Sequence, residues 1–288
     1  MARDFVIMTD SCCDLPAQMV QQMGVQVLPL SFLMDGREYF NHPDNRDITP
    51  KEFYNKLREG KLGTTSAVSV GAFQEAMEII AAQGKDILCL NFSSALSTTY
   101  QSAVIAAEDV MKTHPECRIL VWDTLAASMG QGMLIWLAAR KKSEGASIEQ
   151  TLAYVQDCRS RLQTWVTVND LFHLKRGGRV SAASAVVGTM LQMKPIIELS
   201  DEGKLEVRSK IRGRKASIQH LLDKVDELNG DPAVFFISHG DCEDEVDEMV
   251  AALRKKYGKN IEVKVNFVGP VIGNHTGPGV IAFFFLTK

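Results

Sequence analysis

Short apolar runs alternate with helical patterns through the first part of the chain, and this alternation constrains the fold more than any other feature. The runs lie at residues 5–8, 25–30, 86–91 and 118–123, and the helical patterns lie at 70–83, 98–110 and 126–143. Ser147-Ile148-Glu149-Gln150 has the composition of a capping box and predicts one more helix, to about Arg161. Strands that alternate with helices of this length are typical of parallel pairing in a layered α/β fold. We therefore predict a three-layer α/β domain with a parallel sheet over residues 1–161.

The pattern changes near Leu162, where strand signals become paired. The strand patterns at 195–199 and 204–209 flank Ser200-Asp201-Glu202-Gly203, a turn composition that joins antiparallel neighbours. Further strand patterns lie at 163–168, 234–239 and 261–267, and helical patterns lie at 214–228 and 243–257. We expect a two-layer α/β domain with a mixed sheet over residues 162–288. A length of 288 residues, about twice that of a typical domain, agrees with two domains.

The charge balance and the cysteines argue against several classes of function. The chain has 32 basic and 35 acidic side chains, a net charge of -3, whereas nucleic-acid binders are usually basic. None of the 6 cysteines forms a CxxC pair or has the histidine spacing of a zinc site, so we expect free thiols, no metal and no nucleic-acid partner. The acidic residue Asp4 occurs before an apolar run of the kind found in secretory signals can form, which argues against such a signal. No apolar stretch is long enough to span a bilayer. We therefore expect a cytoplasmic protein.

Two distant segments concentrate hydrogen-bond donors on backbone that glycine bends freely. They are Gly63-Thr64-Thr65-Ser66 and Gly273-Asn274-His275-Thr276-Gly277-Pro278-Gly279. Hydroxyls, backbone amides and an imidazole without neighbouring carboxylates suit an anion, because they replace the water that a carboxylate or a phosphate loses. These segments predict a site for a negatively charged group.

Two further segments follow predicted strands, at the edge where open parallel sheets bind their ligands. Asp10-Ser11-Cys12-Cys13-Asp14 could hold a metal between its two aspartates, but we favour the interpretation that Ser11 or Asp14 caps the next helix near Leu15-Pro16. Asn91-Phe92-Ser93-Ser94-Ala95 carries two hydroxyls. One of them is expected to cap the helix that follows, and the other either does the same or donates to a ligand.

The segment Leu174-Lys175-Arg176-Gly177-Gly178-Arg179 combines three cations with two glycines. It is either a solvated loop or a surface that presents guanidinium groups to an anionic group or an acidic partner. The basic run from Arg208 to Lys215 would help the second interpretation. The residues alone leave both open.

Recognisable motifs for hydrolysis and nucleotide binding are missing from the sequence. A hydrolase would pair Ser94 with His275 and an aspartate such as Asp170, yet the chain has no GxSxG segment. Gly130-Gln131-Gly132 has Ile135 where a dinucleotide fingerprint has its third glycine, and no GxxxxGKS or GxxxxGKT loop is present. Close helix packing explains the glycine pair better. We therefore expect no nucleotide site and no cofactor.

Taken together, these segments resemble the DegV family, bacterial fatty-acid-binding proteins that serve as the B subunits of fatty acid kinase. The resemblance covers essentially the whole chain and rests on an ordered set of short segments. They are Thr9-Asp10-Ser11, Asp14-Leu15-Pro16, Thr65-Ser66, 93–97, 99–103, Asp123-Thr124, Leu174 to Ser181, Lys194-Pro195 and 275–279. The chain departs from the family pattern at Cys12-Cys13, at Ala67-Val68 and at Thr98, which replaces a usual glycine. These departures leave loop shape and acyl-chain preference open.

The resemblance implies two α/β domains and a buried long-chain fatty acid whose carboxylate is held by a threonine, a serine and a histidine. On the matching positions these are Thr65, Ser94 with Ser93 beside it, and His275 with Thr276 beside it. It also implies an ATP-dependent fatty acid kinase subunit as partner, which forms acyl phosphate for phospholipid synthesis. The basic residues implied in docking that subunit are Lys175, Arg176 and Arg179. The chain itself would then be a carrier and not an enzyme.

Elementary energetics agree with a carrier. A buried carboxylate needs several donors, and a doubly protonated His275 would add charge assistance and have a raised pKa in the complex. The 12 methionines would line a long pocket or serve as ordinary core residues.

The alternative function is a hydrolase or phosphotransferase that uses Ser94, His275 and Asp10 on a small anionic substrate. A DNA-associated regulator disagrees with the near-neutral charge, and a transient membrane contact stays open.

Overall fold

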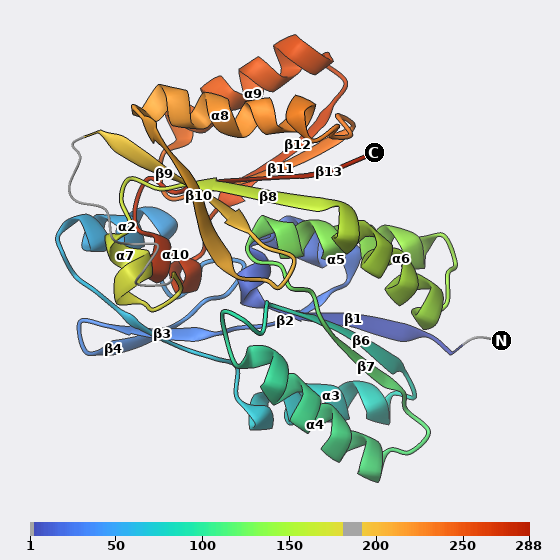
Figure 1. The fold of residues 1–288 in the computed structure, drawn as a ribbon. Helices are drawn as coiled ribbons and strands as arrows, with labels where there is room; N and C mark the ends of the chain where they lie inside the picture. Colours follow the sequence, from blue (N-terminus) through green and yellow to red (C-terminus); the bar gives the residue numbers. More distant parts are fainter. Residues whose placement is uncertain (1–2, 181–191) are drawn as a thin grey trace.

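The computed structural model describes residues 3–180 and 192–288, and Figure 1 shows two layered units with short elements between them. Ser181, at the end of one segment that carries the family resemblance, lies outside the described residues. The strands form sheets of 4, 6 and 3 strands. Among the described residues, no helix combines the length and the apolar character that crossing a membrane requires.

The N-terminal sheet is parallel and has the strand order β2-β1-β6-β7. Its strands are β1 (Phe5–Asp10), β2 (Gln26–Leu28), β6 (Asp86–Asn91) and β7 (Ile119–Asp123). One face is covered by α3 (Val70–Ala82) and α4 (Thr99–Thr113), and the other by α5 (Met129–Ser143) and α6 (Ile148–Arg161), as Figure 1 shows. Every residue of β6 is buried, as expected for a central strand between two helical layers. The predicted three-layer arrangement with a parallel sheet is confirmed.

Local chemistry sets where these helices begin. The Ser147 hydroxyl accepts a hydrogen bond from the Gln150 N–H, and the Gln150 side chain accepts one from the Ser147 N–H. The predicted capping box of α6 is therefore confirmed. Helix α5 begins later than predicted from Ala126, because Leu125 and Ser128 have φ angles of 47° and 53°, outside the helical region.

The C-terminal sheet is mixed and has the strand order β10-β9-β8-β13-β11-β12. Its strands are β8 (Leu162–Thr167), β9 (Met193–Leu199), β10 (Leu205–Arg212), β11 (Val234–His239), β12 (Glu262–Phe267) and β13 (Ile281–Leu286). The pair β11 and β12 is parallel, and β9 and β10 form the antiparallel pair predicted from the turn between them. Helices α8 (Arg214–Glu227) and α9 (Glu243–Tyr257) cover one face (Figure 1), which confirms the predicted two-layer arrangement.

The other face of the C-terminal sheet packs against the N-terminal unit. Val166, Ile197 and Phe284 from this sheet belong to the same hydrophobic core as Met129 and Leu134 of α5. The chain passes from α6 directly into β8, with no linker between the units. The two units therefore share a packed interface.

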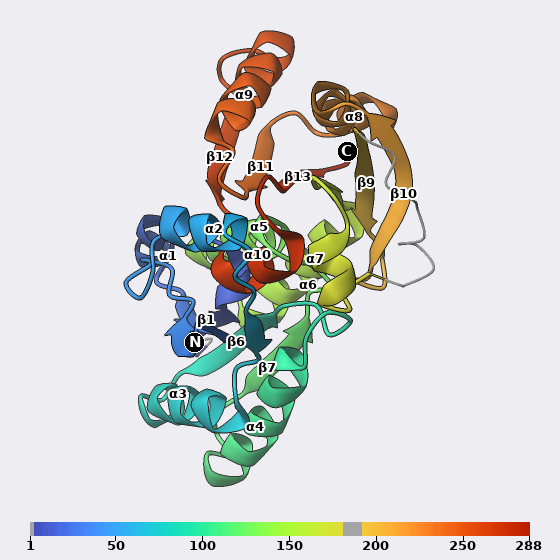
Figure 2. The same cartoon turned by 90° about the vertical axis from the view of Figure 1, so that its left-hand side faces the viewer.

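Short elements that the sequence pattern did not reveal gather where the two units meet, as Figures 1 and 2 show. They are β3 (Ser31–Met34), β4 (Arg37–Phe40), β5 (Thr64–Ser66), α2 (Pro50–Arg58), α7 (Phe172–Arg176) and α10 (Pro270–Thr276). The chain also forms the short 3-10 helix η1 (Ser11–Cys13) and α1 (Ala17–Met23). The strands β4, β3 and β5 form a small antiparallel sheet, and α10 contacts α2, α7, β3 and β5. Such short elements show too little periodicity to be predicted.

Candidate ligand-binding site

A cavity of about 460 Å³ lies between the C-terminal sheet and the N-terminal unit. Strands β8, β9 and β13 supply one wall, α10 a second, and the loops that follow β6 and β7 a third. A volume of this order is typical of a site for a small organic molecule. Most of the wall is apolar and includes Val166, Ile197, Val271, Ala282 and Phe284. No methionine among the described residues lines the cavity, so none of these methionines is part of the adaptable lining considered from the sequence.

One end of the cavity holds a hydrogen-bonded threonine and histidine. Thr65 lies in β5 and His275 in the last turn of α10, and Thr65 Oγ1 is 2.9 Å from His275 Nε2. Antiparallel pairing with Phe32 of β3 holds Thr65 in place. The Gly63 N–H donates to Asn274 Oδ1 (3.0 Å), which ties the start of β5 to α10. The fold thus brings together the two donor segments that were predicted to bind an anion.

The surroundings of His275 decide its charge. Burial and the guanidinium groups of Arg179 and Arg176 lower the pKa of His275 to about 4. The imidazole is therefore neutral at pH 7, not doubly protonated, and it has one N–H to donate. Its Nδ1 has no hydrogen-bond partner among the described residues and lies against Gly177, where a Cβ atom would come within 2.0 Å of it. The sequence indicated the basic character of this segment but not the need for glycine at 177.

The three predicted docking residues differ in what they contact. Arg179 lines the cavity, and its guanidinium donates to two backbone carbonyls, at 3.2 Å and 2.5 Å. Arg176 donates to the carbonyl oxygens of Gly63 (3.1 Å) and Asn274 (2.8 Å), so it joins α7 to both donor segments. Lys175 is exposed. Two of the three cations therefore contact the cavity wall or the two donor segments, and not solvent alone.

The predicted hydroxyl donors are placed differently from one another. Ser94 is exposed and lines the cavity. Ser93 is buried outside the cavity wall, and its hydroxyl donates to Gly203 O (2.8 Å). Thr276 lines the cavity, and its hydroxyl donates to a carbonyl of its own helix (3.2 Å). Neither serine caps α4, whose N-cap is Thr98, so the expectation that one of them does is wrong.

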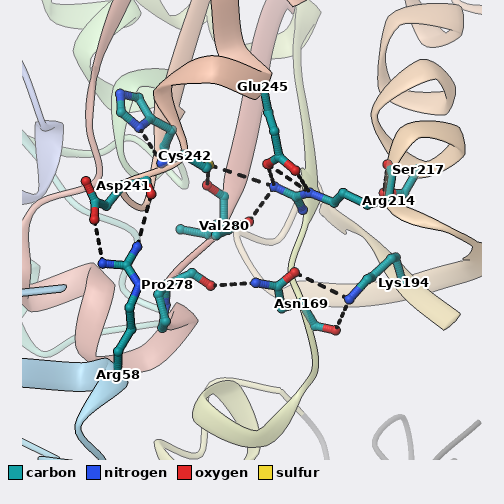
Figure 3. Close-up of polar contacts among 12 residues, drawn as sticks. Arg58, Asn169, Lys194, Arg214, Ser217, Asp241, Cys242, Glu245, Pro278 and Val280 are labelled. Carbon is teal, nitrogen blue, oxygen red and sulfur yellow. Dashed lines mark hydrogen bonds and ion pairs between the residues drawn. The ribbon is translucent and has the colours of Figure 1, made fainter. Parts of the chain in front are cut away.

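The glycine segment after the last turn of α10 is clamped from two sides (Figure 3). Asn169 Nδ2 donates to Pro278 O (3.1 Å), and Arg214 donates to Gly279 O (2.7 Å). A Cβ atom at Gly279, where φ is 78°, would lie 2.3 Å from Asn169 Nδ2, so only glycine fits. Arg214 also pairs with Glu245 at 2.6 Å. This arginine, predicted as part of a basic surface, instead holds the segment that carries the histidine.

Asp10 and Asp14 are buried, and within residues 3–180 and 192–288 no group of three or more potential metal ligands is found. Asp10 caps η1, because its Oδ1 accepts a hydrogen bond from the Cys12 N–H (3.0 Å). Helix α1 has Pro16 as its N-cap and no side-chain cap. The prediction that Ser11 or Asp14 caps this helix is therefore wrong.

Asp14 instead bridges the two units. Its Oδ1 accepts a hydrogen bond from the Gly269 N–H (3.0 Å), and its Oδ2 accepts one from the Ser128 hydroxyl (2.6 Å). Ser128 Oγ lies 2.8 Å from Ser238 Oγ in β11. Burial raises the pKa of Asp14 to about 7 and that of Asp10 to about 6. No local sequence pattern predicts this bridge, because its members are far apart in the chain.

The residues of the alternative hydrolase are not arranged as a triad. A nucleophilic serine needs a base within hydrogen-bond reach, and that base needs an orienting group. Among the described residues no hydrogen bond joins His275 to Ser94 or to Asp170, and Asp170 accepts one from the Phe172 N–H (2.8 Å). A Cβ atom at Gly130 would lie 2.7 Å from Phe284, so close packing explains this glycine as expected.

Curated relatives match the chain over nearly its whole length. A family model described as "Uncharacterised protein, DegV family" matches residues 4–288. A DegV domain-containing protein of Clostridium perfringens is 41% identical over 286 residues, which are 99% of this chain and 98% of that protein. One from Streptococcus pyogenes serotype M3 is 36% identical over 286 residues, 98% of each.

Solved structures share the fold. A DegV family protein from Thermus thermophilus, described by its fatty acid binding, has a TM-score of 0.86 and 34% identity, and the match covers 100% of both chains. DegV of Bacillus subtilis, described as a fatty acid binding protein, has a TM-score of 0.86 and 26% identity over 100% of both chains. A stearic acid-binding protein from Eubacterium ventriosum has a TM-score of 0.87 and 26% identity, over 99% of this chain and 98% of that one.

Proposed function

The chain belongs to the DegV family, and we propose that it binds a long-chain fatty acid in the cavity between its two units. One observation carries the proposal: a largely apolar cavity has the hydrogen-bonded pair of Thr65 and His275 in its wall. The solved relatives described as fatty acid binding proteins support it. The ligand's acyl chain would lie along the apolar wall and its carboxylate at the pair.

The acyl chain supplies most of the affinity. Burial of a methylene group yields about 0.8 kcal/mol, so a chain of about fifteen carbons yields on the order of 12 kcal/mol. Association costs roughly 4 to 15 kcal/mol, and a sufficiently long acyl chain can therefore bind without a covalent bond. A short anion such as acetate has no acyl chain to bury and therefore lacks this favourable free energy. We therefore expect affinity to rise with chain length until the cavity is filled.

The head group needs donors that compensate for lost water. We assign these donors to the hydroxyls of Thr65 and Ser94 and to the neutral imidazole of His275. Thr276 lies beside the imidazole in the cavity wall. Ser93 supports the loop that carries Ser94 through its hydrogen bond to Gly203. Positive charge comes from the arginines near the imidazole, not from the imidazole itself. Such a set holds a carboxylate without transferring a proton to it. This is the chemistry of a carrier.

The first test is native mass spectrometry of the full chain, followed by lipid analysis of what denaturation releases. We expect about one fatty acid per chain after purification or after incubation with added fatty acid. A chain that neither carries nor takes up fatty acid would contradict the proposal. That result would favour the alternative function, a hydrolase or phosphotransferase that acts on a small anion.

A matched pair of variants in β5 tests the head-group assignment. Thr65→Val removes the hydroxyl that bonds His275, whereas Thr64→Val makes the same change on the neighbouring exposed residue. A hydrogen bond to a charged group is worth about 1.5 to 3 kcal/mol, so Thr65→Val should weaken binding roughly 10-fold to 100-fold. Equal affinities in the two variants would remove Thr65 from the site.

We further propose that the bound carboxylate is presented to an ATP-dependent fatty acid kinase subunit, which forms acyl phosphate for phospholipid synthesis. The family resemblance suggests this role, and a basic face beside the anion site supports it. Lys175 is exposed there, and Arg176 and Arg179 lie on the same segment with their guanidinium groups bound to backbone carbonyls. Lys175 is therefore the docking residue that can be changed without disturbing the site.

A coupled assay tests this presentation. Fatty acid phosphorylation by the kinase subunit is measured with this chain carrying Lys175→Ala or, as control, Lys215→Ala on α8. The side chain of Lys215 is 92% exposed, and Figure 1 shows α8 in the outer helical layer of the C-terminal unit, apart from α7. We expect Lys175→Ala to slow phosphorylation severalfold while lipid occupancy is unchanged. Normal rates in both variants would exclude the docking role of Lys175.

A further inference from the structure

On two central strands of the C-terminal sheet, the lining of the cavity ends at one level. Along the last strand the lining residues are Val280, Ala282 and Phe284, of which the last two belong to β13. On β8 they are Thr164 and Val166, which pair across the strands with Phe284 and Ala282. Among the described residues of β8 and β13, none beyond the pair of Thr164 and Phe284 lines the cavity. The ring of Phe284 therefore stands at the last level of these two strands that the cavity reaches.

The first of these levels adjoins the head-group end of the cavity. A Cβ atom at Gly240 would lie 2.7 Å from Val280 Cγ1 and 3.0 Å from Gly277 O, so Val280 lies beside the turn that follows His275. From Val280 to Phe284 a strand advances about 13 Å, at roughly 3.3 Å per residue. An acyl chain whose carboxylate lies at His275 would therefore run along β13 and end at the ring of Phe284.

The ring of Phe284 is held on another side by α5. A Cβ atom at Gly130, in the first turn of that helix, would lie 2.7 Å from Cδ1 and 2.9 Å from Cε1 of the ring. Gly130 is buried and does not line the cavity, and Phe284 is 1% exposed. Met133 and Leu134 of α5 belong to the same hydrophobic core as Phe284. The ring therefore has a close-packed helix on one side and the cavity on another.

From this arrangement we infer that Phe284 limits the length of the acyl chain that the cavity accepts, and that the missing side chain at Gly130 sets where its ring lies. The inference rests on the proposed fatty-acid function and deepens it. Affinity should rise about fourfold with each added methylene group while the acyl chain still gains apolar contact. Once the terminal methyl group meets the ring, a further methylene group must displace it, and overpacking of a core is unfavourable. Affinity therefore passes through a maximum at one chain length.

Competition binding with the full, delipidated chain tests this limit. Saturated fatty acids of successive lengths displace a fluorescent fatty acid, and the dissociation constants identify the acid that the wild-type chain binds best. Phe284→Val opens the end wall and keeps a residue type that suits a strand. We expect this variant to favour the acid two carbons longer, relative to the wild-type preference, by roughly tenfold, because two further methylene groups are buried.

The matched control is Phe285→Val on the same strand. Phe285 is as buried as Phe284, but its side chain points to the opposite face of β13 and belongs to the same core as Leu221 of α8 and Met249 of α9. Phe285 does not line the cavity. The control loses a comparable amount of core packing, so it should be destabilised without a change in the preferred length. Thermal unfolding of both variants checks that they are folded and similarly destabilised.

Gly130→Ala should act in the opposite direction, because the added Cβ atom displaces the ring towards the cavity. We expect it to favour shorter acids, by about fourfold for each methylene group that no longer fits. If Phe284→Val does not fold, Phe284→Leu removes less volume and should shift the preference to longer acids by about fourfold, for one methylene group. An unchanged preferred length in the folded Phe284 variant and in Gly130→Ala, with fatty acids still bound, would overturn this inference alone. Failure of the wild-type chain to bind any of the acids would overturn the proposed function with it.

Discussion

The two ends of α10 meet opposite kinds of charge. At its C-terminal end His275 bonds Thr65 beside the guanidinium group of Arg179, and no carboxylate among the described residues lines the cavity. At its N-terminal end Gly269 donates to the buried carboxylate of Asp14. Both ends are polar and half-buried, and both join segments far apart in the chain. They differ in the sign of the charge that they bring near the cavity.

This difference gives the cavity a direction. An anionic head group finds donors and cations at one end, whereas at the other end it would approach Asp14 behind Ser128, and Asp14 carries a negative charge above its pKa of about 7. Like charges repel more strongly where little water screens them. A fatty acid is therefore expected to bind in one orientation. Variants that weaken either end test this polarity.

The largest effect is expected from Gly177→Ala. A Cβ atom at this position would lie 2.0 Å from His275 Nδ1, so the imidazole must move away from Thr65. Overpacking of this kind costs about 1 to 3 kcal/mol of stability, and the misplaced donor weakens fatty acid binding as well. Gly71→Ala is the control, because nothing lies within 4 Å of its Cβ position in α3. Thermal unfolding and fatty acid titration of both variants measure the difference, and equal behaviour would contradict the packing argument.

A smaller effect is expected from removal of the imidazole itself. His275→Ala should weaken fatty acid binding roughly 10-fold to 100-fold, because a hydrogen bond to a charged group is lost while the arginines remain. In the double variant with Thr65→Val the losses should not add, since the two side chains bond each other. A double-mutant cycle on dissociation constants measures this coupling. Strict additivity would show that the two groups act separately.

The carboxylate end is tested by Asp14→Asn. Burial raises the pKa of Asp14 from 3.8 to about 7, so the folded state holds this proton more tightly than the unfolded state. The contribution to stability is fully present below the unfolded pKa and is lost as pH rises through the folded pKa. Wild-type stability relative to Asp14→Asn should therefore fall by on the order of 2 kcal/mol between pH 5 and pH 8. Asparagine tolerates the left-handed φ of 50° at this position.

Urea unfolding of both chains at the two pH values makes this measurement. Asp201→Asn, at a fully exposed side chain, serves as the control and should keep the wild-type profile. A profile for Asp14→Asn that follows the wild type would show that Asp14 is ionised in the folded state at pH 5.

The smallest effect is expected for the pH dependence of binding. Burial and the two arginines lower the pKa of His275 to about 4, so the imidazole stays neutral from pH 7 to pH 9 unless the ligand reverses both causes. We expect affinity for a fatty acid to be nearly constant in this range. If the complex instead bound a proton at His275, affinity would fall about tenfold for each unit of pH between the pKa of the free chain and the pKa of the complex, and would level off above the latter. Isothermal titration at three pH values decides between the two.

The sequence pattern predicted the long helices and the strands of the two main sheets well. The candidate site was predicted only through the resemblance to a known family. The alternation of strands and long helices sufficed because burial on both faces of β6, for example, requires an unbroken apolar run. Thr65 and His275 lie in short elements, 210 residues apart, whose meeting depends on tertiary packing. Their pairing came from the family pattern and not from spacing. The roles of Gly177 and Asp14 depend on neighbours that no local pattern reveals.

The direct passage from Arg161 in α6 to Leu162 in β8 has a consequence for exchange of the ligand. A cleft between domains that open on a flexible linker exchanges its content by hinge motion, but here the two units share one core and no linker. A fatty acid is then expected to enter and leave past the short elements and loops at the rim of the cavity, where Ser94 and Gly178 are exposed. The residence time of such a ligand would depend on local motion of these few residues, and not on the motion of whole domains.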